Sequence, residues 1–251
     1  MLVFAHRGAS GHEPENTLLA IKRALAMQVD AIEIDVHLLA DGELIVTHDR
    51  WLKSQLKPLK RIRDLTLAQI KLIDVGKGQA APTLNEVLEC INGECLVNIE
   101  LKAERTVIPM MKVMDEAIAR WNFQPSQFLF SSFNHHLLFE LKTLNSHLNT
   151  GALTASCPLD YASFAQRLNA YSVHIDIDFV NQDFVDDAHR RGLKVFVYTV
   201  DNEEDIVEMH HLGVDGIFSN YPTRSLIKVA HLQSQQVPGL NPMLANTRLQ
   251  D

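Results

Sequence analysis

The amino-acid sequence predicts an α/β protein folded as a (β/α)₈ barrel of the TIM type, with a small insertion after the second strand. Short apolar runs alternate along the chain with amphipathic stretches of helical period, which indicates repeated βαβ units around a parallel sheet. Eight such runs favour a closed barrel over an open doubly wound sheet. The 251 residues suit one barrel, and a hydrophobic content of 46% is enough for a sizeable core.

The individual elements follow from these runs in chain order. The expected strands are residues 2–5, 31–36, 95–101, 127–131, 148–153, 172–176, 194–198 and 213–218. The expected helices are residues 17–27, 83–91, 107–121, 135–144, 161–168, 184–191, 203–212 and 223–232. Gly192 and Gly213 stand where helices should end before a strand, and Pro222 suits the first turn of the last helix.

Two segments lie outside this repeat. Residues 43–46 form a short extra strand after the turn at Asp41-Gly42, and residues 50–82 form an irregular insertion at one end of the barrel, with a short helix near 67–73. We expect a single domain over residues 1–232, followed by a polar, poorly packed tail over 233–251 that contains two prolines and a glycine.

Composition excludes several classes of function. A net charge of −8 without dense basic clusters argues against nucleic-acid binding, and the basic stretch at 53–63 is better explained as a solvated loop than as an attractor of anions. No apolar run approaches the roughly 20 residues needed to span a membrane, and the apolar start is too short for a signal peptide. Cys90, Cys95 and Cys157 lack metal-type spacing, which favours reduced thiols and a cytoplasmic location. Oligomeric state is not indicated.

Carboxylates interrupt two strands that should otherwise be apolar. Glu33 and Asp35 alternate with aliphatic residues on the second strand and therefore share one face, as do Asn98, Glu100 and Lys102 on the next. Buried unpaired carboxylates are costly, and one cation could relieve all three acids. Such an oxygen site suits Mg²⁺ or Ca²⁺ better than Zn²⁺. Ion pairing with Arg7 or Lys102 explains the same residues equally well.

Two histidines are placed at the same end of the barrel. His6 directly follows the first strand and His48 follows the extra strand, and residues just past the strand ends line the active site of such barrels. A histidine pair can supply a base and an acid in one cycle. The planar guanidinium of Arg7 matches the oxygens of a phosphoryl group, so the set indicates phosphoryl transfer. A less favoured second metal site would use His174, Asp176 and Asp178.

The ordered combination of motifs resembles the glycerophosphodiester phosphodiesterase family, in its short single-domain bacterial form. The motifs run from residue 2 to about 225, and the His-Arg-Gly opening alone would not be specific. They are His6-Arg7-Gly8-Ala9-Ser10, Pro14-Glu15-Asn16-Thr17, Glu33-Ile34-Asp35, Asp41-Gly42, His48-Asp49, Pro82-Thr83-Leu84, Asn98-Ile99-Glu100-Leu101-Lys102, Ser132-Phe133 and Gly213-Val214-Asp215-Gly216.

The resemblance implies metal-dependent hydrolysis of glycerophosphodiesters to glycerol 3-phosphate and an alcohol, through a cyclic phosphate. It implies one divalent cation on Glu33, Asp35 and Glu100, and an acid–base pair of His6 and His48. It further implies that Arg7 and Lys102 hold the phosphate and that Phe133 forms an apolar wall near the glycerol. Tyr198 stands where the family usually has tryptophan, so we expect an altered substrate fit.

Two alternatives remain open on the sequence. The same residues could serve a lysophospholipase D-like activity on lysophospholipids, for which Leu52, Leu56 and Leu59 of the insertion could line an apolar mouth. A catalytically silent protein that binds small anions could retain Arg7 and Lys102, but would have no need for both His6 and His48.

Overall fold

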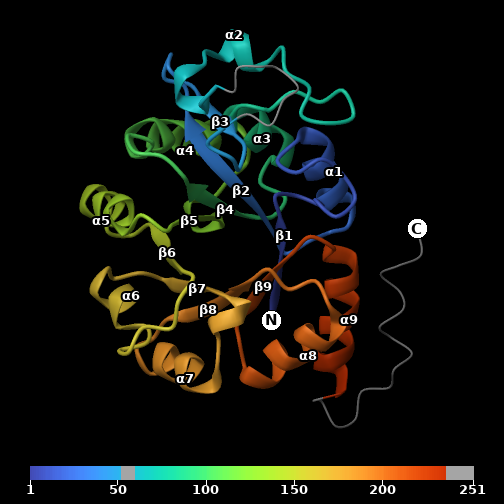
Figure 1. The fold of residues 1–251 in the computed structure, drawn as a ribbon, viewed down its shortest axis with the longest axis vertical. Helices are drawn as coiled ribbons and strands as arrows, with labels where there is room; N and C mark the ends of the chain where they lie inside the picture. Colours follow the sequence, from blue (N-terminus) through green and yellow to red (C-terminus); the bar gives the residue numbers. More distant parts are fainter. Residues whose placement is uncertain (52–59, 236–251) are drawn as a thin grey trace.

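The computed structural model describes residues 1–51 and 60–235, and it has the predicted barrel at its centre (Figure 1). Eight parallel strands follow one another in the order β1-β9-β8-β7-β6-β5-β4-β2, and a β1–β2 pairing closes the ring. They are β1 (Leu2–His6), β2 (Ala31–Leu38), β4 (Leu96–Leu101), β5 (Phe128–Ser132), β6 (Asn149–Thr154), β7 (Ser172–Asp176), β8 (Lys194–Tyr198) and β9 (Gly216–Ser219). The predicted fold class is confirmed.

Helices surround this ring on the outside, as Figure 1 shows. The α-helices that follow the barrel strands are α1 (Leu18–Ala26), α3 (Leu84–Ile91), α4 (Val107–Arg120), α5 (His135–Leu144), α6 (Ser163–Arg167), α7 (Gln182–Arg190), α8 (Glu203–Leu212) and α9 (Pro222–Gln235). Their starts are chemically marked, since Thr17 caps α1 by accepting from the N–H of Ala20, and Thr83 forms a capping box with Glu86 at α3. Gly213 ends α8 with a positive φ of 79°.

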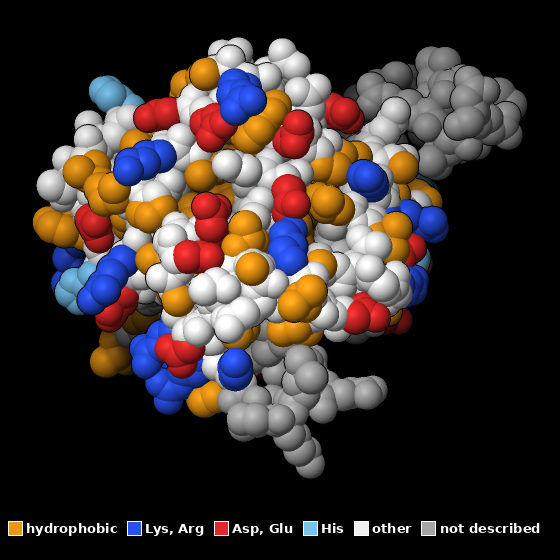
Figure 2. Space-filling model, turned by 90° about the horizontal axis from the view of Figure 1, so that it is seen from above, with side chains coloured by type: hydrophobic (Ala, Val, Ile, Leu, Met, Phe, Trp, Pro, Cys, Tyr) orange, Lys and Arg blue, Asp and Glu red, His pale blue; other side chains and the backbone are white. Residues whose placement is uncertain are grey.

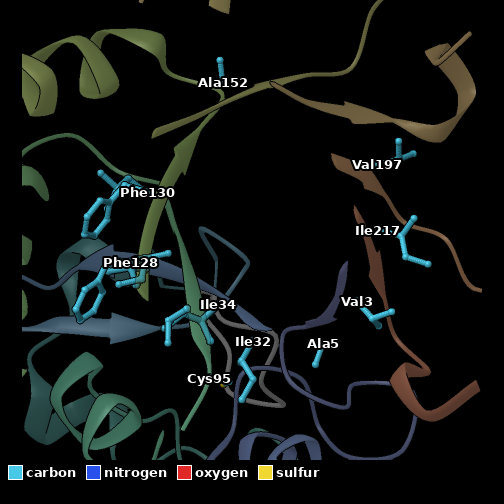
Figure 3. Close-up of a cluster of buried hydrophobic side chains, with 14 of the residues drawn as sticks. Val3, Ala5, Ile32, Ile34, Cys95, Phe128, Phe130, Ala152, Val197 and Ile217 are labelled. Carbon is cyan, nitrogen blue, oxygen red and sulfur yellow. The ribbon is translucent and has the colours of Figure 1, made fainter. Parts of the chain in front are cut away.

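Apolar side chains pack in two layers because strand residues alternate in direction. Val3 and Ile32 belong to the large cluster between the strands and the outer helices, part of which Figure 3 shows. Phe4, Phe196 and Phe218 belong to a smaller cluster inside the barrel. The barrel is therefore filled from within as well as covered from outside, so the pocket described below is confined to one end.

The insertion contains the short helix expected near residues 67–73 and a small apolar cluster of its own. The extra strand β3 (Leu44–Val46) pairs antiparallel with β2, and η1 (Ile62–Asp64), a 3₁₀ helix, and α2 (Leu67–Ile70) follow it. A separate apolar cluster joins this part of the chain and includes Leu39, Ile45, Ile62, Leu65, Ile70, Ile73 and Ala81. The insertion over 50–82 therefore has its own small core, although residues 52–59 lie outside the described part.

The start of the C-terminal tail was predicted wrongly. We expected the last helix to end at residue 232, but α9 continues to Gln235. Leu232 is buried against the main core, and the hydroxyl of Ser234 donates to the carbonyl of His231, so the helical turn is completed beyond the last apolar residue. Pro222 opens this helix as predicted. Residues 236–251 lie outside the described part.

Candidate active site

A pocket of ≈180 Å³ opens at the carboxyl ends of the barrel strands. Residues from all eight barrel strands and the loops after them form its wall, together with His48 from the loop after β3. The lining residues are His6, Arg7, Glu33, His48, Asn98, Glu100, Lys102, Ser131, Phe133, Leu153, His174, Tyr198, Thr199 and Phe218. All predicted site residues except Asp35 are in this set. A wider groove of ≈530 Å³ between α1 and α3 contains none of them.

The three predicted carboxylates lie together beside this pocket. Glu33 and Asp35 come from β2 and Glu100 comes from β4, where the strand register places Asp35 opposite Glu100. One oxygen from each of the three residues lies within 4.8 Å of the others, and within residues 1–51 and 60–235 this is the one group of acidic, histidine or cysteine side chains so arranged. Asp35 is only 1% exposed, so this negative charge is removed from water.

The ion pairs that the sequence allowed are also present. The Arg7 Nε lies 3.2 Å from Asp35 Oδ2, and the Lys102 Nζ lies 2.7 Å from Glu100 Oε1 and 3.5 Å from Asp35 Oδ1. Two cations leave one of the three negative charges unbalanced. Asp35 Oδ1 also has no hydrogen-bond donor. Ion pairing and a cation site are therefore compatible, and the donor set of carboxylate oxygens fits Mg²⁺ or Ca²⁺.

The electrostatic imbalance is visible in the pKa values of the acids. Burial, with the neighbouring charges of Asp35 and Glu100, raises the pKa of Glu33 well above its ordinary value. Burial and Asp35 raise the pKa of Glu100 to about 7. Burial also acts to raise the pKa of Asp35, but Lys102 and Arg7 outweigh it and lower that pKa. Without a further positive charge, a proton on Glu33 or Glu100 reduces the repulsion.

The local backbone brings Arg7 and His6 into place. The backbone N–H of Arg7 donates to Glu33 Oε2 at 2.9 Å, so the loop after β1 is tied to the acid cluster. Gly8 follows with a φ of +77°, and a Cβ there would lie 2.7 Å from the carbonyl carbon of Ala20. The glycine of the His-Arg-Gly motif is thus required by the close approach of the loop to α1.

The two histidines face the same pocket but have different partners. His6 Nδ1 lies 2.8 Å from Asn220 Oδ1, and burial lowers the pKa of His6, as does the charge of Arg7. His48 Nδ1 lies 3.0 Å from Asp49 Oδ1. The backbone carbonyl of His48 lies 3.1 Å from His37 Nε2 on β2, which anchors the His48 loop to the barrel.

Sequence reasoning missed several supporting residues. Asn16 donates to Asp35 Oδ2 at 2.9 Å, His37 holds the His48 loop, and Asn220 contacts His6. Asn16 lies in a motif that the sequence analysis quoted, but nothing in a linear motif shows which side chain it meets.

Two aromatic side chains, Phe133 and Tyr198, lie together at the pocket wall. The rings of Phe133 and Tyr198 meet edge to face with centroids 6.0 Å apart, and both line the pocket. The Tyr198 hydroxyl donates to the carbonyl of Thr154 at 2.8 Å, which fixes its ring. Phe133 is 48% exposed, so an incoming molecule can cover its face.

The less favoured second metal site does not form. His174 points into the barrel, is fully buried, and has its ring centroid 5.3 Å from both Phe196 and Phe218. Its Nε2 lies 2.9 Å from Ser172 Oγ, and a Cβ at position 151 would come within 2.2 Å of that nitrogen, so Gly151 makes room for the ring. Asp176 instead accepts from the N–H of Asp178.

Burial of His174 predicts a specific loss of stability in acid. Burial lowers the pKa of His174 from 6.5 to about 3. Between these pH values His174 is protonated in the unfolded chain but neutral in the folded protein. The free energy of unfolding should therefore fall as pH drops from about 6.5 towards 3, by at most about 1.4 kcal/mol per pH unit from this group. Denaturant unfolding of wild type and His174→Gln at several pH values measures it. In His174→Gln the free energy of unfolding should change less with pH than in wild type, whereas in the exposed His136→Gln it should change as much as in wild type. An equal pH dependence in all three proteins would show that burial of His174 does not cause the loss of stability.

Comparison with known proteins decides the family. A family model described as "Glycerophosphoryl diester phosphodiesterase family" matches residues 6–224. The chain belongs to this family. A relative from Caldanaerobacter subterraneus subsp. tengcongensis, named glycerophosphodiester phosphodiesterase, is 37% identical over 230 residues, covering 88% of this chain and 94% of that protein.

Other members of the glycerophosphoryl diester phosphodiesterase family extend the comparison to structure and to a related activity. An Oleispira antarctica phosphodiesterase solved with the product sn-glycerol-3-phosphate superposes with a TM-score of 0.83 at 29% identity, covering 92% of this chain and 97% of that one. A human lysophospholipase D is 22% identical over 265 residues, covering 88% of this chain and 83% of that protein. The family resemblance inferred from the motifs is confirmed.

Among the described residues, no helix is long and apolar enough to cross a bilayer. Figure 2 views the face on the side of α2, where the coloured acidic and basic side chains are interspersed rather than gathered by sign. Leu52, Leu56 and Leu59, the expected apolar mouth, lie outside the described residues, as does most of the basic stretch at 53–63.

Proposed function

We propose that this protein hydrolyses glycerophosphodiesters to glycerol 3-phosphate and an alcohol in a reaction that depends on a divalent cation. The observation that carries the proposal is the meeting of three carboxylates, two of them buried, with two cationic side chains and two histidines at one pocket of a phosphodiesterase-family barrel. Carboxylates that repel one another need a cation, and the histidines supply the proton transfers.

The anionic phosphate is bound by positive charge at the pocket wall. Arg7 and Lys102 each pair with the acid cluster and also line the pocket, so their remaining donors can hold phosphoryl oxygens. Glu33, Asp35 and Glu100 would hold Mg²⁺ or Ca²⁺, which would balance their charge and supply a Lewis acid for the phosphate. Phe133 and Tyr198 contact the apolar parts of the substrate.

The reaction runs in two steps that use the histidines in turn. One histidine takes the proton of the glycerol hydroxyl next to the phosphate; that oxygen bonds to phosphorus while the bond to the alcohol oxygen breaks, and the other histidine protonates the departing oxygen. The same pair then works in reverse. The second histidine takes a proton from water, the water oxygen bonds to phosphorus, and the first histidine protonates the glycerol oxygen as the cyclic phosphate opens.

Chelation tests the cation directly. Exhaustive treatment with EDTA should abolish release of glycerol 3-phosphate from glycerophosphocholine, and Mg²⁺ or Ca²⁺ should restore it, because the unbalanced acid cluster both repels the phosphate and lacks a Lewis acid. A panel of diesters with different alcohols, assayed in the same way, identifies the preferred head group. Full activity after complete chelation would reject the cation assignment.

Lysophospholipase D activity is the second candidate, favoured by the human relative of that name. The pocket of ≈180 Å³ is large enough for a glycerophosphate group but offers no long apolar channel among the described residues. We therefore expect kcat/KM for glycerophosphocholine to exceed that for long-chain lysophosphatidylcholine by at least about tenfold, since the acyl chain gains little apolar contact. Release of choline measures both reactions. A reversed preference would favour the second candidate.

A catalytically silent anion-binding protein would bind without turnover. Isothermal titration with glycerophosphocholine in the presence of Mg²⁺, showing heat of binding but no product, would support that reading.

The proposed single domain over residues 1–232 and the cytoplasmic location stay predictions.

A further inference from the structure

Behind His6, away from the pocket, two side chains form a short hydrogen-bonded chain. His6 Nδ1 lies 2.8 Å from Asn220 Oδ1, and Asn220 Nδ2 donates to Asp201 Oδ2 at 2.7 Å. Asp201 follows β8 and Asn220 follows β9, so the chain links the loops after neighbouring strands to the end of β1. Neither Asp201 nor Asn220 lines the pocket.

Asp201 determines which way the amide of Asn220 points. Three donors converge on its carboxyl group: the Asn220 side-chain amide, the Asn220 backbone N–H at 2.8 Å, and the Ser219 hydroxyl at 3.1 Å. A carboxylate, which only accepts, is the form that satisfies all three. The NH₂ group of Asn220 must therefore face Asp201, which turns its carbonyl oxygen towards His6.

A second side chain meets the same oxygen of Asn220. The Ser10 hydroxyl donates to Asn220 Oδ1 at 2.7 Å, next to the His6 contact. A hydroxyl can also accept, so Asp201 decides the orientation. A flipped amide would place its carbonyl oxygen against the carboxylate of Asp201 and lose the hydrogen bond at Nδ2.

We infer that Asp201 is a positioning residue that, through Asn220, fixes the neutral imidazole of His6 as the Nδ1–H tautomer. An amide oxygen accepts and does not donate, so the 2.8 Å contact requires the proton on Nδ1. The lone pair then lies on Nε2. The Nε2 atom lies on the pocket side, 4.0 Å from Glu33 Oε2, too far for a hydrogen bond that would compete for the proton.

This tautomer bears on the proposed function, on which this step rests. With its lone pair on Nε2, His6 can take a proton from the glycerol hydroxyl or from water. His48 Nδ1 faces the carboxylate of Asp49 at 3.0 Å, so neutral His48 also carries its proton on Nδ1. The two histidines are thus held in the same tautomer by different partners.

The tautomer is measured without substrate, on the Mg²⁺-bound protein at a pH of about 8, where histidines are neutral. Two-bond ¹⁵N–¹H correlation spectra distinguish Nδ1–H from Nε2–H, and the His6 signals are identified by their loss in His6→Gln. Wild type should show the proton on Nδ1, and Asp201→Asn should shift it to Nε2, because the new amide no longer prefers the NH₂ of Asn220. A wild-type proton on Nε2, or an unchanged Nδ1–H in Asp201→Asn, would overturn the inference.

Kinetics and a compensating variant complete the test. Asp201→Asn should lower kcat for glycerophosphocholine by about 10- to 100-fold with little change in KM, since the phosphate contacts remain. The exchanged pair Asp201→Asn/Asn220→Asp restores an acceptor at His6 Nδ1 and should recover most of the lost kcat. Asp205→Asn, four residues on and bonded to Asn202, is the matched control and should keep its kcat. Loss of kcat in the exchanged pair equal to that in Asp201→Asn would point to a merely structural role and refute the inference.

The outcomes separate this inference from the proposed function. If wild type releases no glycerol 3-phosphate, the proposed function fails, while the spectra still decide the tautomer. If wild type is active and Asp201→Asn keeps both its kcat and the Nδ1–H signal, the positioning role fails and the proposed function stands.

Discussion

Replacing His6 or His48 by alanine is expected to lower kcat by about 100- to 10,000-fold, because each removes one of the two proton transfers in both steps. The two side chains line one pocket but come from different segments, His6 from the end of β1 and His48 from the loop after β3, so neither can substitute for the other. Steady-state release of glycerol 3-phosphate from glycerophosphocholine, at saturating Mg²⁺, measures the loss. The double variant should be little worse than either single one, since residues of one catalytic unit are not additive.

A histidine outside the pocket provides the control for this experiment. His12 is exposed and packs against Tyr221, so His12→Ala should keep kcat within about twofold. Circular dichroism of each variant should match wild type, because neither pocket histidine is fully buried. A kcat close to wild type in either His6→Ala or His48→Ala would remove that residue from the mechanism.

Glu33→Gln and Glu100→Gln are each expected to lower activity without lowering the melting temperature of the cation-free protein. Each removes one carboxylate from the proposed cation site, so activity should fall by at least about 100-fold at the Mg²⁺ concentration that saturates wild type. Each also removes charge that is buried beside two other carboxylates, so without cation the variants should unfold at a temperature equal to or above that of wild type.

Thermal unfolding with and without cation makes this test quantitative. Ligand at about 100 times its Kd stabilises a folded protein by about 2.7 kcal/mol, so saturating Mg²⁺ should raise the melting temperature of wild type clearly. The same addition should have little effect on Glu33→Gln or Glu100→Gln. Glu43→Gln, an exposed acid beside β3, is the control and should keep the full shift. A full Mg²⁺-dependent shift in both site variants would exclude these acids as ligands.

The fold was predictable because its signals are local and repeated. Each barrel strand is a short apolar run, and the helices between them begin at side chains that cap them, such as Thr17 and Thr83. The errors fall where a local signal is weak. The last helix runs past its final apolar residue, and the insertion builds its small core from scattered single residues such as Ile62 and Ile70.

The acids and histidines of the site were predictable for a different reason. Glu33 and Asp35 alternate with aliphatic residues on a strand that must be buried, so their common face could be read from the strand period alone. The partners of these residues could not. The contact of Asn220 with His6 spans 214 positions and depends on how the barrel closes between β1 and β9. His174 lies on the inner face of β7, where its ring contacts Phe196 and Phe218. The strand period alone does not distinguish a metal ligand there from a side chain that fills the barrel.

The separate apolar cluster of the insertion affects how the two histidines are brought together. His6 is held by the closed ring of strands, whereas His48 follows β3, and Ile45 of β3 belongs to the cluster that holds the insertion. Regions with their own small cores can open without global unfolding, at a lower free energy than the rest of the molecule. Opening of this cluster alone would therefore move His48 relative to His6, while the closed ring of strands keeps His6 in place.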